Sequence, residues 1–117
     1  MLKKKYRLTK RKQFNYIYRK GRSAHSELVT LVFSYCKMPN IKVGFSASKK
    51  VGNSVKRHRV LRLMREAVKP FMDKMTPNHN YIFIAKEGAA EKALAEISKC
   101  VESVLTRAGL KSKASEK

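Results

Sequence analysis

Acidic residues are scarce in this sequence. Eight Asp and Glu stand against 28 Lys and Arg, which gives a formal net charge of +20 over 117 residues. Self-repulsion of that size opposes the compact state, so a polyanionic partner is the natural explanation of the composition. Hydrophobic residues still make up 43% of the chain, a fraction typical of a folded protein and not of a chain disordered throughout. The composition therefore predicts a folded domain that binds nucleic acid.

Cysteines and metal-ligand patterns are scarce too. Cys36 and Cys100 form no CxxC pair and have no histidine near them in the sequence. They are typical of reduced thiols that serve as small apolar residues. His25, His58 and His79 lack the spacing of metal ligands. Because paired carboxylates, a Gly-rich phosphate loop and a marked Ser-His-Asp arrangement are also missing, we expect no metal, cofactor or catalytic group on the protein itself.

No long hydrophobic run is present. Charged residues interrupt every apolar stretch well before the roughly 20 residues that span a membrane. The first 12 residues are basic but lack the apolar stretch of a secretory signal. A helix lying on a lipid surface would need a free apolar face, and the apolar faces here are needed for a core. We therefore expect a cytoplasmic protein with no membrane partner.

The first half of the chain predicts a helix followed by a β-hairpin. A helix is predicted over residues 10–20, after a Thr that can cap it, and Gly21 would end it. The stretch 27–36 is rich in β-branched and aromatic residues, and 41–47 alternates apolar with small or polar residues. Because a Pro-Asn turn sequence separates the two stretches, we expect them to pair as a hairpin.

The second half predicts a long helix, a strand and a final helix. The stretch Gly52-Asn53-Ser54 offers an N-cap for the long helix, and Pro70 should kink or stop it near the preceding residue. Residues 80–85 predict a strand, and residues 89–108 predict a helix that Gly109 terminates.

These elements form one small domain. The order of helix, hairpin, long basic helix, strand and helix predicts a single-domain α+β fold over residues 1–117, with helices packed against a small sheet. Residues 1–8 form a basic arm, and residues 111–117 are expected to be a disordered tail.

The stretch from position 48 to position 66 carries the strongest functional pattern. At about 100° per residue, one stripe of the predicted helix, opposite its apolar face, carries His58, Arg62, Arg65 and Lys69. Such a run is usually a solvated face, but Glu66 is the only acidic residue between positions 48 and 72, so ion pairs within the helix do not explain it. Cations in the first turn of a helix are unfavourable against its dipole unless an anion lies nearby. A phosphate held by backbone N–H groups and Arg side chains would supply that anion.

Aromatic and basic residues also alternate in the first predicted helix. Phe14 and Tyr18 lie one turn apart, flanked by Lys12 and Arg19. Rings that stack on unpaired bases, with cations near the phosphates, are a common way of holding single strands. The other interpretation is that the two rings pack the helix on the sheet, and the sequence leaves both interpretations open.

The run GFSASKKVGNSVKRHRVLRLMREA, residues 44–67, resembles the signature of the bacterial ribonuclease P protein component. That family typically reads V-S-K-K-V-G-N-A-V-x-R-N-R-x-x-R-x-x-R-E. The resemblance extends to the basic arm, the first helix, the strand at residues 81–86 and the last helix, so it covers nearly the whole chain. Two positions depart from the pattern: His58 stands where the family usually has Asn, and Leu61 stands where Lys or Arg is common.

The resemblance implies a protein that binds a large catalytic RNA. The assembled enzyme removes 5′ leaders from precursor tRNA, by hydrolysis that needs divalent metal ions such as magnesium held mainly by the RNA. The family's R-N-R segment maps to Arg57, His58 and Arg59 and faces the RNA subunit. Its leader-binding cleft lies between the first helix and the sheet, with aromatic positions that map to Phe14 and Tyr18. The resemblance also implies a left-handed β-α-β crossover, against the usual right-handed rule.

Two sets of residues are therefore predicted to contact RNA. The RNA-subunit set is Lys49, Lys50, Asn53, Lys56, Arg57, His58, Arg59, Arg62 and Arg65. The leader set is Phe14, Tyr18, Lys12 and Arg19.

Three other functions fit parts of the sequence. A ribosomal-type structural RNA-binding protein shares the charge and the fold class, and only the signature stretch favours ribonuclease P over it. A double-stranded DNA binder could use the long helix in a major groove, but no partner helix of a helix-turn-helix is evident. A nuclease that acts alone would need the catalytic groups that the sequence lacks.

Overall fold

The computed structural model describes residues 11–35, 41–76 and 78–109. The predicted arm, the Thr cap before the first helix, the Pro-Asn turn and the predicted tail lie outside the described residues. The α-helices are α1 (Arg11–Lys20), α2 (Ser54–Val68) and α3 (Leu94–Ala108). The strands are β1 (Arg22–His25), β2 (Val29–Tyr35), β3 (Ile41–Ala47) and β4 (His79–Ala85). The described residues also contain the short 3₁₀ helices η2 (Lys49–Val51), η3 (Lys69–Lys74) and η4 (Ala89–Glu91).

The four strands form one mixed sheet in the order β1-β2-β4-β3. β1 pairs antiparallel with β2, β2 pairs antiparallel with β4, and β3 lies parallel to β4 at the other edge. The chain therefore passes from β3 through α2 to its parallel neighbour β4, which is a β-α-β crossover. The left hand that the resemblance implies for this crossover stays a prediction. The α+β class is confirmed.

The predicted hairpin between residues 27–36 and 41–47 is wrong, because β4 lies between these two strands. The reason is burial: Tyr81, Ile82 and Phe83 are consecutive and all fully buried, so β4 needs cover on both faces and takes a central place in the sheet. β3 alternates apolar with polar residues, so it can lie at the edge of the sheet, where one side of the strand has no neighbour. The hairpin of this fold is β1–β2, whose first strand is too short and polar to be predicted.

The ends of the helices follow local signals. α2 stops at Val68, two residues before Pro70, as predicted. The last helix begins at Leu94 and not at residue 89, because Ala93 is extended and the preceding residues form the separate turn η4. Gly109 ends α3 in the left-handed conformation with φ 72°, which confirms its predicted role.

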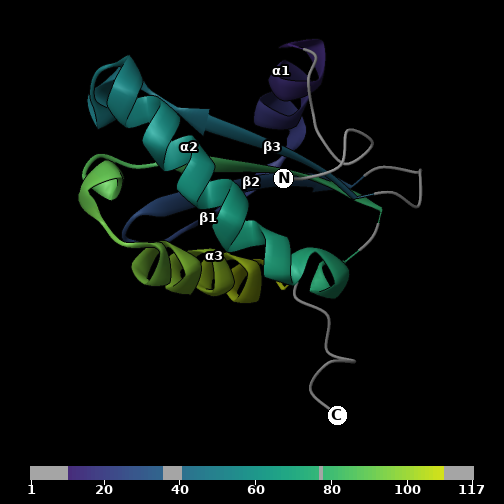
Figure 1. Ribbon diagram of the computed structural model, residues 1–117. Helices are drawn as coiled ribbons and strands as arrows, with labels where there is room; N and C mark the ends of the chain where they lie inside the picture. The colour runs from purple at the N-terminus through teal and green to yellow at the C-terminus, as the bar shows by residue number, and fades with distance from the viewer. Residues whose placement is uncertain (1–10, 36–40, 77, 110–117) are drawn as a thin grey trace.

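Helices cover both faces of the sheet (Figure 1). α2 and α3 bury their apolar faces against one side, where Val60 and Met64 of α2 meet Leu31 and Phe83 of the strands. α1 packs on the opposite side through Ile17, in a smaller cluster whose sheet residues are Val32, Ile82 and Ile84. Neighbouring residues of β2 and β4 thus point to different helical layers, as strand geometry requires.

Gly21 sets the position of α1 on the sheet. Its backbone N–H donates to the carbonyl oxygen of Ile17 at 2.7 Å. A Cβ at this position would lie 2.5 Å from the carbonyl oxygens of both Ile17 and Phe33, and both are backbone atoms that cannot rotate away. The helix can therefore approach β2 this closely only because residue 21 has no side chain.

Replacing Gly21 by Ala is expected to destabilise the fold. Overpacking against fixed atoms costs roughly 1–3 kcal/mol, and each kcal/mol lowers the unfolding midpoint by about 4 °C in a domain of this size. Thermal unfolding followed by circular dichroism measures the change. Ser23→Ala, in the exposed edge strand, is the matched control and should melt like the wild type. A Gly21→Ala protein that melts with the control would show that α1 is not held at this distance.

Candidate nucleic-acid interface

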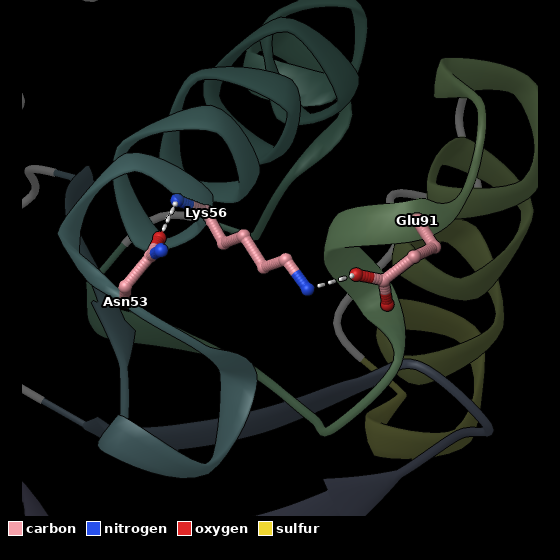
Figure 2. Close-up of polar contacts among 3 residues, drawn as sticks. All are labelled: Asn53, Lys56 and Glu91. Atoms are coloured by element: carbon pink, nitrogen blue, oxygen red, sulfur yellow. Dashed lines mark hydrogen bonds and ion pairs between the residues drawn. The ribbon is translucent and has the colours of Figure 1, made fainter.

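Two residues, Gly52 and Asn53, fix the conformation of the chain at the start of α2. The side-chain Oδ1 of Asn53 accepts a hydrogen bond from the backbone N–H of Lys56 at 3.1 Å (Figure 2). Gly52 precedes it with φ +145°, a conformation that L side chains rarely adopt. A Cβ there would meet the Lys56 side chain at 2.6 Å. The N-cap predicted within residues 52–54 is therefore Asn53, and its side-chain oxygen is already used within the fold.

Replacing Asn53 by Ala should cost about 1 kcal/mol, because the backbone N–H of Lys56 loses its acceptor. That loss corresponds to a midpoint about 4 °C lower. Asn53→Ser keeps an oxygen at the cap and should restore most of the stability. Thermal unfolding of the two variants separates these results. Equal midpoints for Asn53→Ala and Asn53→Ser would show that the cap contributes nothing.

Lys56 has an acidic partner that the sequence did not reveal. Its Nζ lies 3.2 Å from a carboxylate oxygen of Glu91, which η4 brings to the start of α2 (Figure 2). Both side chains are about half exposed, so the pair adds little to stability. Glu91 nevertheless supplies an anion near the N-terminus of α2, where a phosphate had been the expected one. No local signal could have found it, since the two residues are far apart in the sequence.

Most of the remaining basic residues of the predicted set are exposed, and only Arg57 and Arg65 are half-buried. Lys49 and Lys50 are exposed on η2, which buried Val51 fixes to the core. His58, Arg59 and Arg62 are exposed on α2. We call Lys49, Lys50, Arg57, His58, Arg59 and Arg62 the α2 basic face.

Two hollows lie along the α2 basic face. The first, of about 190 Å³, is lined by Ala47, Ser54, Arg57, His58 and Leu61. The second, of about 450 Å³, is lined by His58, Arg62, Arg65 and Glu66. His58 lines both hollows, so the residue that departs from the family's Asn stands at the centre of the face. A surface of cations around open hollows suits phosphate groups, which Arg side chains bind with two parallel hydrogen bonds.

Two predicted contact positions also have roles inside the fold. The guanidinium of Arg65 lies 5.8 Å from the ring centre of Phe45, within the range of a cation–π contact, and the residue is half-buried. Leu61, where the family commonly carries a cation, packs partly against the main core. Arg65 therefore ties α2 to β3 besides lining the second hollow.

The leader set gathers on α1. The rings of Phe14 and Tyr18 lie with centres 6.3 Å apart at 48°. Phe14 is half-buried against the smaller core cluster, whereas Tyr18 is 44% exposed. Lys12 and Arg19 are exposed on the same helix. Phe14 thus packs the helix on the sheet, whereas Tyr18 presents its ring to solvent, and stacking of RNA bases on the pair stays a prediction.

The described parts of the chain contain neither a cluster of metal-ligating side chains nor a helix that could span a membrane. Over residues 11–35, 41–76 and 78–109, no three His, Cys, Asp or Glu side chains gather so that they could hold a metal ion. No helix among them is long and apolar enough to cross a membrane.

Comparisons with known proteins agree on one family. The family model described as ribonuclease P matches residues 2–109. The ribonuclease P protein component of Bacillus cereus strain B4264 is 33% identical over 111 residues, which cover 94% of this chain and 96% of that protein. The component of Bacillus anthracis strain CDC 684 is 32% identical and covers 94% and 93%.

Solved structures lead to the same family. The RNase P protein of Staphylococcus aureus superposes with a TM-score of 0.81 at 30% identity, covering 90% of this chain and 96% of that one. The RNase P protein of Thermotoga maritima, at 20% identity, has a TM-score of 0.77 over 86% and 96% and supports the fold. The family model spans both the α1 helix and the α2 basic face. The chain belongs to the ribonuclease P protein family, and it is a subunit of ribonuclease P.

Proposed function

We propose that this protein holds RNA for a catalytic RNA subunit and does not cut RNA itself. The α2 basic face binds the RNA subunit, and α1 binds the single-stranded 5′ leader of precursor tRNA. Removal of the leader is carried out by the RNA subunit, with the magnesium ions that the RNA holds, in the cytoplasm. The protein's part is to bind and orient the two RNAs.

The α2 basic face is the observation that carries this proposal. Its residues are exposed except for half-buried Arg57. Arg57, His58 and Arg62 line the two hollows. Among the described residues, Glu66 is the only acidic one that lines either hollow. Lys56 pairs with Glu91, so the charge available to RNA comes mainly from the other residues of the predicted set. Arginine suits this task because its planar fork matches two phosphate oxygens and it stays charged at every physiological pH.

The α1 helix supports the second part of the proposal. Tyr18 presents an exposed ring beside half-buried Phe14, and exposed Lys12 and Arg19 flank them. A flexible, unpaired leader fits this arrangement, because every base offers a flat face for stacking and the cations attract its backbone without a choice of sequence.

The purified protein alone should not hydrolyse precursor tRNA. Over the described residues, no three His, Cys, Asp or Glu side chains gather so that they could hold a metal ion, and the three histidines have no metal-ligand spacing in the sequence. Incubation of RNA-free, nuclease-free protein with end-labelled precursor tRNA and magnesium tests this. Sustained release of the leader, at a rate proportional to protein concentration, would contradict the proposal that the protein only binds.

A further inference from the structure

One hollow in the structure belongs to neither predicted contact set. It has a volume of about 350 Å³ and is lined by Lys20, Arg22, Phe33, Ser34, Tyr35 and His79. β3 and β4 are parallel and end together at Ala47 and Ala85, next to the start of α2. Tyr35 pairs with His79 at the other end of β4. The hollow therefore lies at the end of the sheet remote from the start of α2.

The chemistry of this hollow combines cations with an open ring. Tyr35 is 68% exposed, more than Tyr16 or Tyr18. Lys20 and Arg22 are both exposed, and none of the six lining residues is acidic. A single exposed aromatic residue is ordinary on a protein surface. An exposed ring at the rim of a hollow with two cations is what an unpaired nucleotide needs, a face for the base and charge for the phosphate.

The Tyr35 ring is also held in place. Its centre lies 5.8 Å from that of the His79 ring at 86°, and His79 in turn lies 6.2 Å from buried Tyr81. Tyr81 stacks with Phe83, and Phe83 stacks with Phe45, which lies under Arg65 of α2. A row of rings thus supports Tyr35 from the core. A ring that is fixed before binding loses less conformational entropy when a base stacks on it.

We propose that the hollow at Tyr35 binds an unpaired nucleotide of RNA, with the base on the Tyr35 ring and the phosphate near Lys20 and Arg22. This inference rests on the proposed function only in taking RNA as the partner. It adds a third contact surface, at the opposite end of the sheet from the start of α2. An RNA strand bound there meets the protein at residues that belong to neither predicted contact set.

The test uses the full chain without any catalytic RNA. Equilibrium binding of a short fluorescein-labelled oligouridylate is measured by fluorescence anisotropy for the wild type, Tyr35→Leu and Tyr35→Phe. Stacking of a base is worth roughly 5- to 150-fold in affinity, so Tyr35→Leu should bind at least about 5-fold more weakly. Tyr35→Phe keeps the ring and should bind like the wild type. Arg22→Gln should flatten the salt dependence by about 0.7 in the logarithmic slope, the value for one phosphate of a single strand.

As a control, thermal unfolding is measured for each variant, and the exposed substitutions at Tyr35 and Arg22 should leave the unfolding midpoint unchanged. Wild-type affinity in folded Tyr35→Leu would overturn the proposal. Equal weakening of Tyr35→Leu and Tyr35→Phe would also overturn it, because the hydroxyl and not the ring would then be responsible. Since this assay contains no precursor tRNA and no catalytic RNA, its result is independent of whether leader removal is reconstituted.

Discussion

The affinity of this protein for the RNA subunit is expected to fall by roughly 10³ to 10⁵ between about 50 and 200 mM salt. That range corresponds to six to ten phosphate contacts, each of which releases condensed counterions from the RNA. The α2 basic face, with its two hollows, offers contacts on this scale. Filter binding over a series of salt concentrations gives the slope. A nearly flat slope would mean that phosphate contacts do not dominate the interface.

Arg59→Ala should weaken that binding and flatten the slope by about one phosphate contact. Arg59 is exposed on α2 and has no core role like that of Arg65, so the loss reports on RNA and not on folding. Lys99→Ala is the matched control, because Lys99 is exposed on α3 and its loss removes the same charge elsewhere. If both variants change the slope equally, net charge and not the α2 basic face governs binding. If neither changes it, Arg59 lies outside the interface.

The second large effect concerns the leader. Tyr18→Ala should lower the affinity of the assembled enzyme for precursor tRNA by roughly 5- to 150-fold, the value of one stacked base. The affinity for mature tRNA should change little, because mature tRNA has no leader. Tyr16→Ala is the matched control, since Tyr16 is 50% exposed on the same helix and lies outside the predicted pair. Parallel measurements on the two tRNAs give the preference for precursor directly.

Phe14 needs a gentler substitution than Tyr18. It packs against the cluster of Ile17, Val32 and Ile82, so Phe14→Ala would leave a cavity in the fold. Phe14→Leu keeps most of the apolar contact but removes the flat ring. Thermal unfolding comes first, and the preference for precursor is then compared in folded variants. Full preference in Phe14→Leu or Tyr18→Ala would show that the ring concerned serves packing alone.

The sequence predicted the helices better than the pairing of the strands. The end of α2 before Pro70 and the end of α3 at Gly109 depend on local conformational limits, so both could be predicted. The position of β4 between β2 and β3 depends on which strand buries both faces, and that is decided only when the helices pack. Because β2 and β3 are adjacent in the sequence, a hairpin between them was expected. The burial of both faces of β4 places β4 between them instead.

The sequence predicted which residues make up the candidate site, but it did not predict the contacts that these residues make within the fold. The helical period and the family signature were enough to predict that His58, Arg59 and Arg62 lie on the exposed face of α2. The pairing of Lys56 with Glu91 needed the tertiary structure, because η4 carries the carboxylate to the start of α2. The hollow at Tyr35 likewise depends on strand register, which places that ring beside His79.

Reconstitution of leader removal tests the central claim most directly. Precursor tRNA is incubated at near-physiological magnesium with a matching catalytic RNA alone, with the protein alone, and with both together. We expect efficient removal of the 5′ leader only when both are present, and a reduced rate when Arg59→Ala replaces the wild-type protein. Cleavage by the protein alone, or a rate with both components no higher than with the RNA alone, would contradict the central claim.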